Sequence, residues 1–121
     1  MTSIQTTFPE VYQQIEEVTI KEGVTSIGAG LLQGCSAVKK LYIPSTVQTI
    51  DANAFADCVS LEKVSIPQLI ASQKLKDVFP SYKKITEVVI QEGVTTLIYG
   101  GPIVDCPSID TVSIPNSLPY T

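Results

Sequence analysis

Apolar residues recur along this 121-residue chain at a nearly constant interval. Five segments open on an aliphatic residue and continue as apolar-x-x-apolar-x-Ile, at Ile15, Val38, Leu61, Ile85 and Ile109. Successive openings lie 23 or 24 positions apart. A fixed period of about 20 to 50 residues is typical of solenoids, in which stacked repeats bury one continuous core. The pattern therefore predicts a repeat array.

Further apolar columns continue through each repeat. One column contains Val24, Val47, Ile70 and Val94, and a second contains Ile27, Ile50 and Leu97. A third contains Leu32, Phe55, Phe79 and Ile103, and a fourth contains Cys35, Cys58, Tyr82 and Cys106. We expect Tyr82 to fill the fourth column where a cysteine is missing. Phe8 and Tyr12 extend the last two columns into the N-terminal segment.

Short parallel strands are predicted at the "VTI"-like core of each repeat. In the first core, Val18 and Ile20 point inward and Thr19 points outward, because successive side chains of a strand alternate between its faces. Strands stacked about 4.8 Å apart then share one core. Three of the strands are followed by proline, which has no N–H and should end the ladder at the same place each time. These prolines are Pro44, Pro67 and Pro115.

The segments between strands return the chain along the other side of the array. "GAGLLQGC" and "DANAFADC" are long enough for one or two helical turns, and Asp51 is a suitable cap for the second. The glycines of the first segment do not form a nucleotide loop. Gln33 stands where a dinucleotide fingerprint has its last glycine, and the G-K-[ST] of a P-loop is absent. We therefore assign these glycines to turns that need a positive φ.

The motif "LxxVxIPxxVxxIxxxAFxxC", carried by Leu41 to Cys58, resembles the BspA-like (Treponema-type) leucine-rich repeat. The resemblance extends from about Phe8 to Pro115. It implies a mainly β, right-handed solenoid with short parallel strands on the concave face and short helical, 3₁₀ or loop returns on the convex side. Two repeats depart from the motif. The third, "IPQLIASQKLKDVFPSY", loses "VxxI" and gains a residue, and the fourth has "GGPIV" in place of "AF".

We expect a single domain in two parts. Residues 1–14 form a partial N-terminal repeat or cap, and residues 15–121 form an array of about four and a half repeats of 23–24 residues. The chain begins part-way through a coil and stops at "IPNSLPYT", after a strand. An uncapped solenoid end exposes apolar columns and unpaired strand edges. We therefore expect end-to-end self-association, or a fragment of a longer array.

Composition argues against several functions. The net charge is −4, every basic residue is Lys, and His and Trp are absent. A protein without Arg or a basic patch is a poor nucleic-acid binder, and without His it lacks the commonest general base and metal ligand. No apolar run approaches the roughly 18 residues needed to span a bilayer. The N-terminus does not resemble a secretory signal. We expect no enzymatic activity, no cofactor and no membrane insertion.

Cysteines and lysines each allow two interpretations. Cys35, Cys58 and Cys106 recur at repeat spacing rather than as C-x-x-C pairs, so we expect buried free thiols rather than a zinc site or a disulfide between the first two.

Lysines cluster around the third repeat and form either a solvated face or, less favoured, a site for an anionic ligand. They are Lys74, Lys76, Lys83 and Lys84.

Charged residues also fall into columns beside the strands. One column contains Glu16, Lys39 and Glu62. In the next, Glu17 is beside Lys40 and Lys63 is beside Glu87, while Lys40 and Lys63 bring like charges together. Opposite charges on adjacent strands stabilise a sheet modestly. We predict that this pairing helps to set the register.

Members of the resembled family occur mostly in surface proteins of bacteria and protists, where long arrays serve adhesion and protein binding. The resemblance implies a non-enzymatic interaction module at the cell surface or outside the cell, binding a host or matrix surface protein through the concave sheet. A cytoplasmic location stays open, and the alternative function is a structural spacer without a ligand. The outward strand positions are the candidate partner-binding residues, with Lys40 beside the large ring of Tyr42: Thr19, Lys40, Tyr42, Ser65, Val89 and Ser113.

Overall fold

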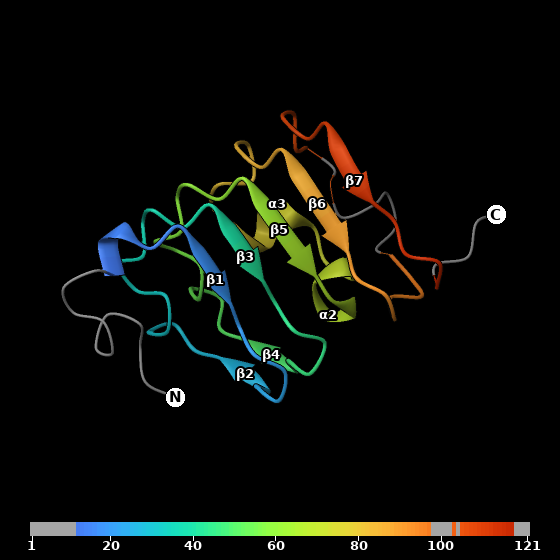
Figure 1. Cartoon of the computed structure of the whole chain (residues 1–121), viewed down its shortest axis with the longest axis horizontal. Helices are drawn as coiled ribbons and strands as arrows, with labels where there is room; N and C mark the ends of the chain where they lie inside the picture. The colour runs from blue at the N-terminus through green and yellow to red at the C-terminus, as the bar shows by residue number, and fades with distance from the viewer. Residues whose placement is uncertain (1–11, 98–102, 104, 118–121) are drawn as a thin grey trace.

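Five short strands form one parallel sheet along the length of the molecule (Figure 1). The computed structural model describes residues 12–97, 103 and 105–117. In space the strands follow their order along the chain, and every pair is parallel. They are β1 (Glu17–Thr19), β3 (Lys40–Tyr42), β5 (Lys63–Ile66), β6 (Glu87–Ile90) and β7 (Thr111–Ser113). The predicted mainly β solenoid is confirmed.

The same backbone contact repeats at all four junctions of this sheet. The N–H groups of Lys39 and Lys40 both donate to the carbonyl of Glu16, at 2.6 and 3.0 Å. The carbonyls of Lys39, Glu62 and Thr86 each accept two N–H groups from the next repeat in the same way. Each strand is thereby paired with the strand one repeat away, so the inward positions of all five strands form continuous columns.

Inward-facing aromatic and aliphatic residues fill the core between the sheet and the returns. Leu32, Phe55 and Phe79 are at most 1% exposed. The rings of Phe55 and Phe79 pack with their centroids 5.0 Å apart and tilted by 40°. Ile103 is partly buried against the same core. The predicted column is confirmed, and each buried side chain of this size contributes about 1.5–3 kcal/mol of transfer free energy.

In the fourth repeat, Gln91 stands where the second, third and fifth repeats have proline. The N–H of Gln91 donates to the carbonyl of Ile66 at 3.1 Å, which continues the ladder. One repeat earlier, Pro67 has no N–H to offer the carbonyl of Ile43. The side-chain Nε2 of Gln91 reaches back to that carbonyl at 2.6 Å and to Ser65 Oγ at 3.1 Å. The acceptor that proline leaves unused in the ladder therefore has a donor from two repeats away.

The returns on the other side form turns and a small second sheet. β2 (Ser26–Ile27) and β4 (Thr49–Ile50) pair in parallel. "GAGLLQGC" and "DANAFADC" are turns in the structure rather than helices. Asp51 acts at the start of the second turn, where its Oδ1 accepts the N–H of Asn53 at 2.8 Å. The predicted cap is confirmed, but it initiates a turn instead of a helix.

Two short helices take the place of a third strand in that second sheet. α2 (Gln68–Ala71) and α3 (Leu75–Val78) lie behind the main sheet near β5 and β6 in Figure 1. Ile70 and Leu75 anchor them in the core at 0% exposure. The third repeat therefore keeps its inward contacts although it has lost the "VxxI" motif.

The column of Ile27, Ile50 and Leu97 does not continue as predicted. Leu97 is 36% exposed, whereas Ile27 is 1% exposed. The two residues before Leu97 form hydrogen bonds with a side chain of α2 instead of with a β-strand. The Oε1 atom of Gln68 accepts the N–H of Thr95 at 3.0 Å, and its Nε2 donates to the Thr96 carbonyl at 2.9 Å. The prediction for Leu97 was wrong because the helical third repeat redirects the fourth.

The cysteine column is also interrupted at the third repeat. Cys35 and Cys58 are fully buried, as predicted. Tyr82 does not fill the next position, because its side chain remains partly exposed, with Lys83 Nζ 5.9 Å from the ring centroid. Ser81 is buried instead, at 5% exposure. The extra residue of this repeat turns the small serine inward and the large ring outward.

Tyr12 covers the N-terminal end of the described array. It lies in the 3₁₀ helix η1 (Tyr12–Gln14) and packs against the core, as its column predicted. Its ring approaches Gly34 so closely that a Cβ there would lie 2.8 Å from Tyr12 Cε2, and Gly34 has a φ of +78°. Phe8 lies outside the described residues. At the other end, Ile114 is 50% exposed, because no further described strand covers it.

Ser81 provides a test of the core. Its buried Oγ has no hydrogen-bond partner within residues 12–97, 103 and 105–117, and an unpaired buried polar group costs about 1–3 kcal/mol. We expect Ser81→Ala to raise the free energy of unfolding by about 1 kcal/mol in urea denaturation. The exposed Ser45→Ala is the control, with a change within about 0.5 kcal/mol. Lower stability of Ser81→Ala would show that the hydroxyl has a partner.

Candidate functional site

The outer face of the main sheet is hollowed into a groove of about 420 Å³ that runs from β1 to β6. We call this region the sheet groove. Five of the six predicted partner-binding residues line it, and Ser113 lies on the same face of β7, opposite Val89 but outside the groove. The lining residues are Glu17, Val18, Thr19, Lys40, Leu41, Tyr42, Lys63, Ser65 and Val89.

Tyr42 is the large side chain of the groove, and it is held in place. Its hydroxyl donates to Glu22 Oε1 at 3.3 Å, so a residue that follows β1 anchors a ring on β3. Partial burial and the neighbouring Glu22 carboxylate raise the pKa of Tyr42 above its ordinary value. The ring is half-buried, which leaves a face open to a partner. A ring fixed before binding loses little conformational freedom on contact.

A notch lies beside this ring, at Ser65. Register places Ser65 directly between Tyr42 on β3 and Val89 on β6. The serine side chain is short, and its Oγ is occupied by the amide of Gln91. Val89 is partly buried on the outer face, so it provides an apolar wall opposite the tyrosine ring. The result is a shallow depression with apolar sides.

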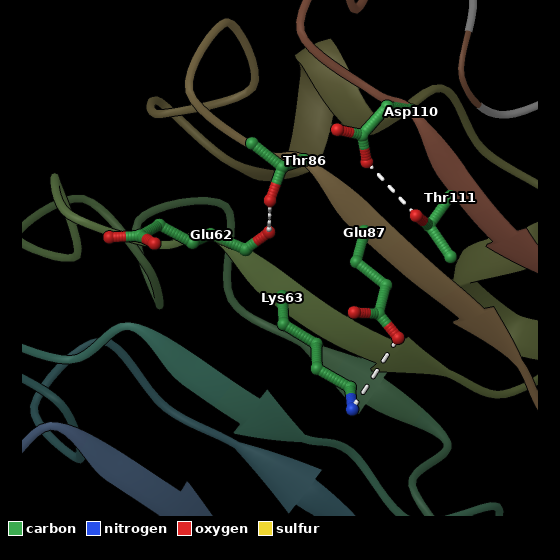
Figure 2. A network of polar contacts seen from close by, with 6 residues as sticks. All are labelled: Glu62, Lys63, Thr86, Glu87, Asp110 and Thr111. Atoms are coloured by element: carbon green, nitrogen blue, oxygen red, sulfur yellow. Dashed lines mark hydrogen bonds and ion pairs between the residues drawn. The ribbon is translucent and has the colours of Figure 1, made fainter.

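A row of four charged residues crosses the strands next to these side chains. Register brings Glu17, Lys40, Lys63 and Glu87 into line on adjacent strands. Lys63 Nζ and Glu87 Oε2 are 3.5 Å apart, and Figure 2 shows the two side chains extending toward one another. No carboxylate in the described part of the chain forms an ion pair with Lys40, which faces Lys63 across the sheet. The row therefore has the charge order minus, plus, plus, minus.

Residues 3–120 match the BspA-type leucine-rich repeat region, in six copies. The chain belongs to the BspA-type leucine-rich-repeat family. The match includes every strand of the sheet groove.

One solved structure that resembles this BspA-type chain is a leucine-rich cell surface protein of Faecalibacterium prausnitzii A2-165. The two are 18% identical with a TM-score of 0.46, and the match covers 88% of this chain and 33% of that one. The chain thus spans about a third of the length of that protein. No curated protein matches the chain.

Several residues of the sheet groove in this BspA-type array were not among the partner-binding residues predicted from the sequence. Glu17 and Lys63 line the groove but were considered only as register-setting charges. They share the outward column of Lys40, so that column already contained the signal. Glu22 and Gln91 contact the groove residues diagonally, from segments that follow β1 and β6. Contacts of this kind do not recur from repeat to repeat, so the repeat pattern of the sequence does not indicate them.

A second row of polar residues lies just before the strands. Lys39 Nζ pairs with Glu16 Oε1 at 3.6 Å, with both side chains at least half exposed. The carboxylate of Glu62 forms no ion pair with Lys39. The backbone carbonyl of Glu62 accepts the Thr86 hydroxyl at 3.3 Å, and Figure 2 shows the Glu62 side chain pointing away from Lys63. The predicted column is therefore an ion pair at one junction only.

Two of the four lysines of the third repeat bind separate partners within the protein. Lys76 Nζ contacts Asp105 Oδ2 at 2.7 Å, and Lys84 Nζ donates to the carbonyl of Val59 at 3.2 Å. The hydrogen bond with Lys76 lowers the pKa of Asp105 and raises that of Lys76. These contacts hold adjacent repeats together, which favours the solvated face over an anion site.

Cys35 and Cys58 are buried free thiols, as predicted, whereas Cys106 is only partly buried. Burial raises the pKa of Cys35 and Cys106, and it raises that of Cys58 to about 12. Because the thiolate is the reactive form, such thiols are poor nucleophiles and metal ligands at neutral pH. The described ranges contain no group of three or more His, Cys, Asp or Glu residues able to hold a metal ion. No described helix is long and apolar enough to cross a membrane.

The Glu16–Lys39 pair provides a test of cross-strand charge pairing. Each single reversal, Glu16→Lys or Lys39→Glu, places like charges together and should destabilise by a few tenths to about 1 kcal/mol. The double reversal restores an opposite pair and should recover most of this loss in urea denaturation. A double variant no more stable than the single variants would refute a role for the pair.

Cys58 predicts a pH dependence. Its folded pKa of about 12 exceeds the ordinary value of 9.0, so the native state retains a proton that the unfolded chain releases. The stabilisation by the neutral thiol is complete below pH 9 and is lost as pH rises toward 12. For this thiol the loss is about 1.4 kcal/mol per pH unit. Urea denaturation of Cys58→Ala between pH 8 and 11 should show a shallower loss. An identical slope would contradict the assignment.

Proposed function

We propose that this BspA-type array is a non-enzymatic protein-interaction module that binds a protein partner through the sheet groove in an adhesion-type contact. The observation that carries the proposal is the position of Tyr42: a partly exposed ring near the centre of a hollowed sheet, fixed by its hydrogen bond to Glu22. Tyrosine is enriched among residues that dominate binding energy, because it combines a large contact area with few rotatable bonds.

The surroundings of the ring support a protein partner. Thr19 offers a hydroxyl group, Val89 offers apolar area, and Lys40 offers a charge beside the ring. A polar rim around an apolar centre is the usual composition of a protein interface. A catalytic role has little support, because the chain contains no His to activate a nucleophile and the thiols stay protonated.

The proposed location is the cell surface or the extracellular space, with a host or matrix surface protein as the partner. Family membership supports this, since BspA-like repeats occur mostly in surface proteins. The solved leucine-rich protein with a similar arrangement is likewise described as a cell surface protein.

A structural spacer is the second candidate. It is favoured by Ile114, the last member of the inward isoleucine column, which is 50% exposed at β7. A further repeat, or a second copy joined end to end, would cover this side chain and pair with the β7 edge. In that case the array serves to hold other parts of a longer assembly apart.

Tyr42→Ala tests the proposed interaction against a matched control, Tyr82→Ala. Both tyrosines are partly exposed, but Tyr82 lies in the turn before β6 and outside the groove. The wild-type chain and both variants are measured by biolayer interferometry on a panel of purified host matrix and surface proteins. We expect Tyr42→Ala to weaken binding at least about five-fold and Tyr82→Ala to leave it unchanged.

The melting temperature of Tyr42→Ala should stay close to that of the wild type, because the ring lies outside the core. Equal affinities of the wild-type chain and both variants would indicate that the interface lies on the returns or on the third repeat. An absence of binding across the whole panel would support the spacer.

A further inference from the structure

We propose that the sheet groove recognises an extended protein segment with a basic, an acidic and a basic residue at alternate positions, lying across the strands. This inference rests on the proposed function and specifies the chemistry of the partner. It is based on the row formed by Glu17, Lys40, Lys63 and Glu87.

The centre of this row is electrostatically incomplete. Lys40 and Lys63 are paired residues on β3 and β5, and both are on the outward face. Like charges directly opposite each other destabilise a sheet. Glu87 compensates Lys63 at 3.5 Å, whereas Lys40 has no ion-pair partner among residues 12–97, 103 and 105–117. A carboxylate from outside, placed between the two lysines, would complete the row.

The spacing of the row fits alternate side chains of an extended chain. Adjacent strands lie about 4.8 Å apart, so three junctions separate Glu17 from Glu87 by roughly 14 Å. In an extended segment, side chains on one face recur about every 6.8 Å, and the first and third are about 13.6 Å apart. When the first and third side chains of the segment are basic and lie over the two glutamates, its second side chain on that face lies between Lys40 and Lys63. That second side chain must therefore be acidic.

The row is accessible, and its internal pair can rearrange. The side chains of Lys63 and Glu87 are 44% and 34% exposed. An exposed ion pair is worth at most about 1 kcal/mol, so new pairs with a ligand can replace it at little cost. A segment with two basic residues and one acidic residue is also attracted by the protein's net charge of −4.

The proposal predicts selectivity between two peptides of identical composition. The probes are end-capped Lys-Ser-Glu-Ser-Lys and its permutation Glu-Ser-Lys-Ser-Lys, titrated into the isotopically labelled full chain and followed by amide chemical shifts. We expect the first to shift the amides of Lys40 and Lys63 and to bind at least about five-fold more tightly than the second. Raising the salt from 50 to 500 mM should weaken the first.

Charge reversal in the groove should change this selectivity. The double variant Lys40→Glu/Lys63→Glu makes the whole row acidic, so it should lose preference for Lys-Ser-Glu-Ser-Lys and gain it for Lys-Ser-Lys-Ser-Lys. The control, Lys74→Glu/Lys83→Glu, changes the net charge equally but lies outside the groove and should retain the wild-type preference. If the double variant does not fold, Lys40→Gln serves, with at least a two-fold loss for the first peptide expected.

Equal binding of the two matched peptides to the wild-type chain, or no binding of either, would overturn the inference. This outcome is distinct from failure of the proposed function. A protein partner that depends on Tyr42 but not on Lys40 would support the groove as an interface while excluding the charge pattern. Selective peptide binding, together with a protein partner whose affinity is unchanged by Tyr42→Ala, would support the charge pattern and contradict the proposed role of Tyr42.

Discussion

The one-repeat register of the parallel backbone ladder determines the rest of this molecule. A single repeat has most of its apolar residues on the inward side of a three- or four-residue strand, and that side is buried only against neighbouring repeats. The carbonyls of Glu16, Lys39, Glu62 and Thr86 each hold two N–H groups of the next turn, so all junctions share one geometry. Inward columns such as Leu32, Phe55 and Phe79 then become continuous, and burial follows from register.

The same register arranges the outer surface. Positions that alternate with the core residues are also brought into rows, one of charged residues and one containing Tyr42, Ser65 and Val89. These rows cross the strands, so a partner meets side chains from several repeats at once. In the proposed interaction, the contacting side chains would therefore come from segments more than 20 residues apart in the chain, with one or two from each repeat.

Sequence periodicity predicted what depends on spacing and missed what depends on an insertion or on contacts between different columns. The strands, the buried phenylalanines and the Lys40–Lys63 juxtaposition follow directly from the 23–24-residue period. The third repeat contains one extra residue, and a pattern alone does not indicate which side chain moves outward. Tyr82 was consequently predicted at the inward position that Ser81 occupies, and Leu97, aligned with Ile27 and Ile50, is 36% exposed.

Outward position alone predicted the candidate residues, of which all but Ser113 line the groove, but it did not predict the residues that support them. Glu22 and Gln91 fix the groove through diagonal hydrogen bonds to Tyr42 and Ser65. Such contacts depend on side-chain length and direction in three dimensions, so alignment of repeats does not reveal them.

The reach of Gln91 changes how this array should unfold. Solenoids are commonly treated as chains of units coupled only to their nearest neighbours, so that a terminal unit can open without affecting the second one away. The bond from Gln91 Nε2 to the Ile43 carbonyl joins residues 48 positions apart and skips an entire turn. Opening the fourth turn therefore removes a hydrogen bond from the second as well. This next-nearest-neighbour coupling is worth about 0.5–1.5 kcal/mol, as for one hydrogen bond, and it makes loss of the fourth repeat more costly than a purely nearest-neighbour array would predict.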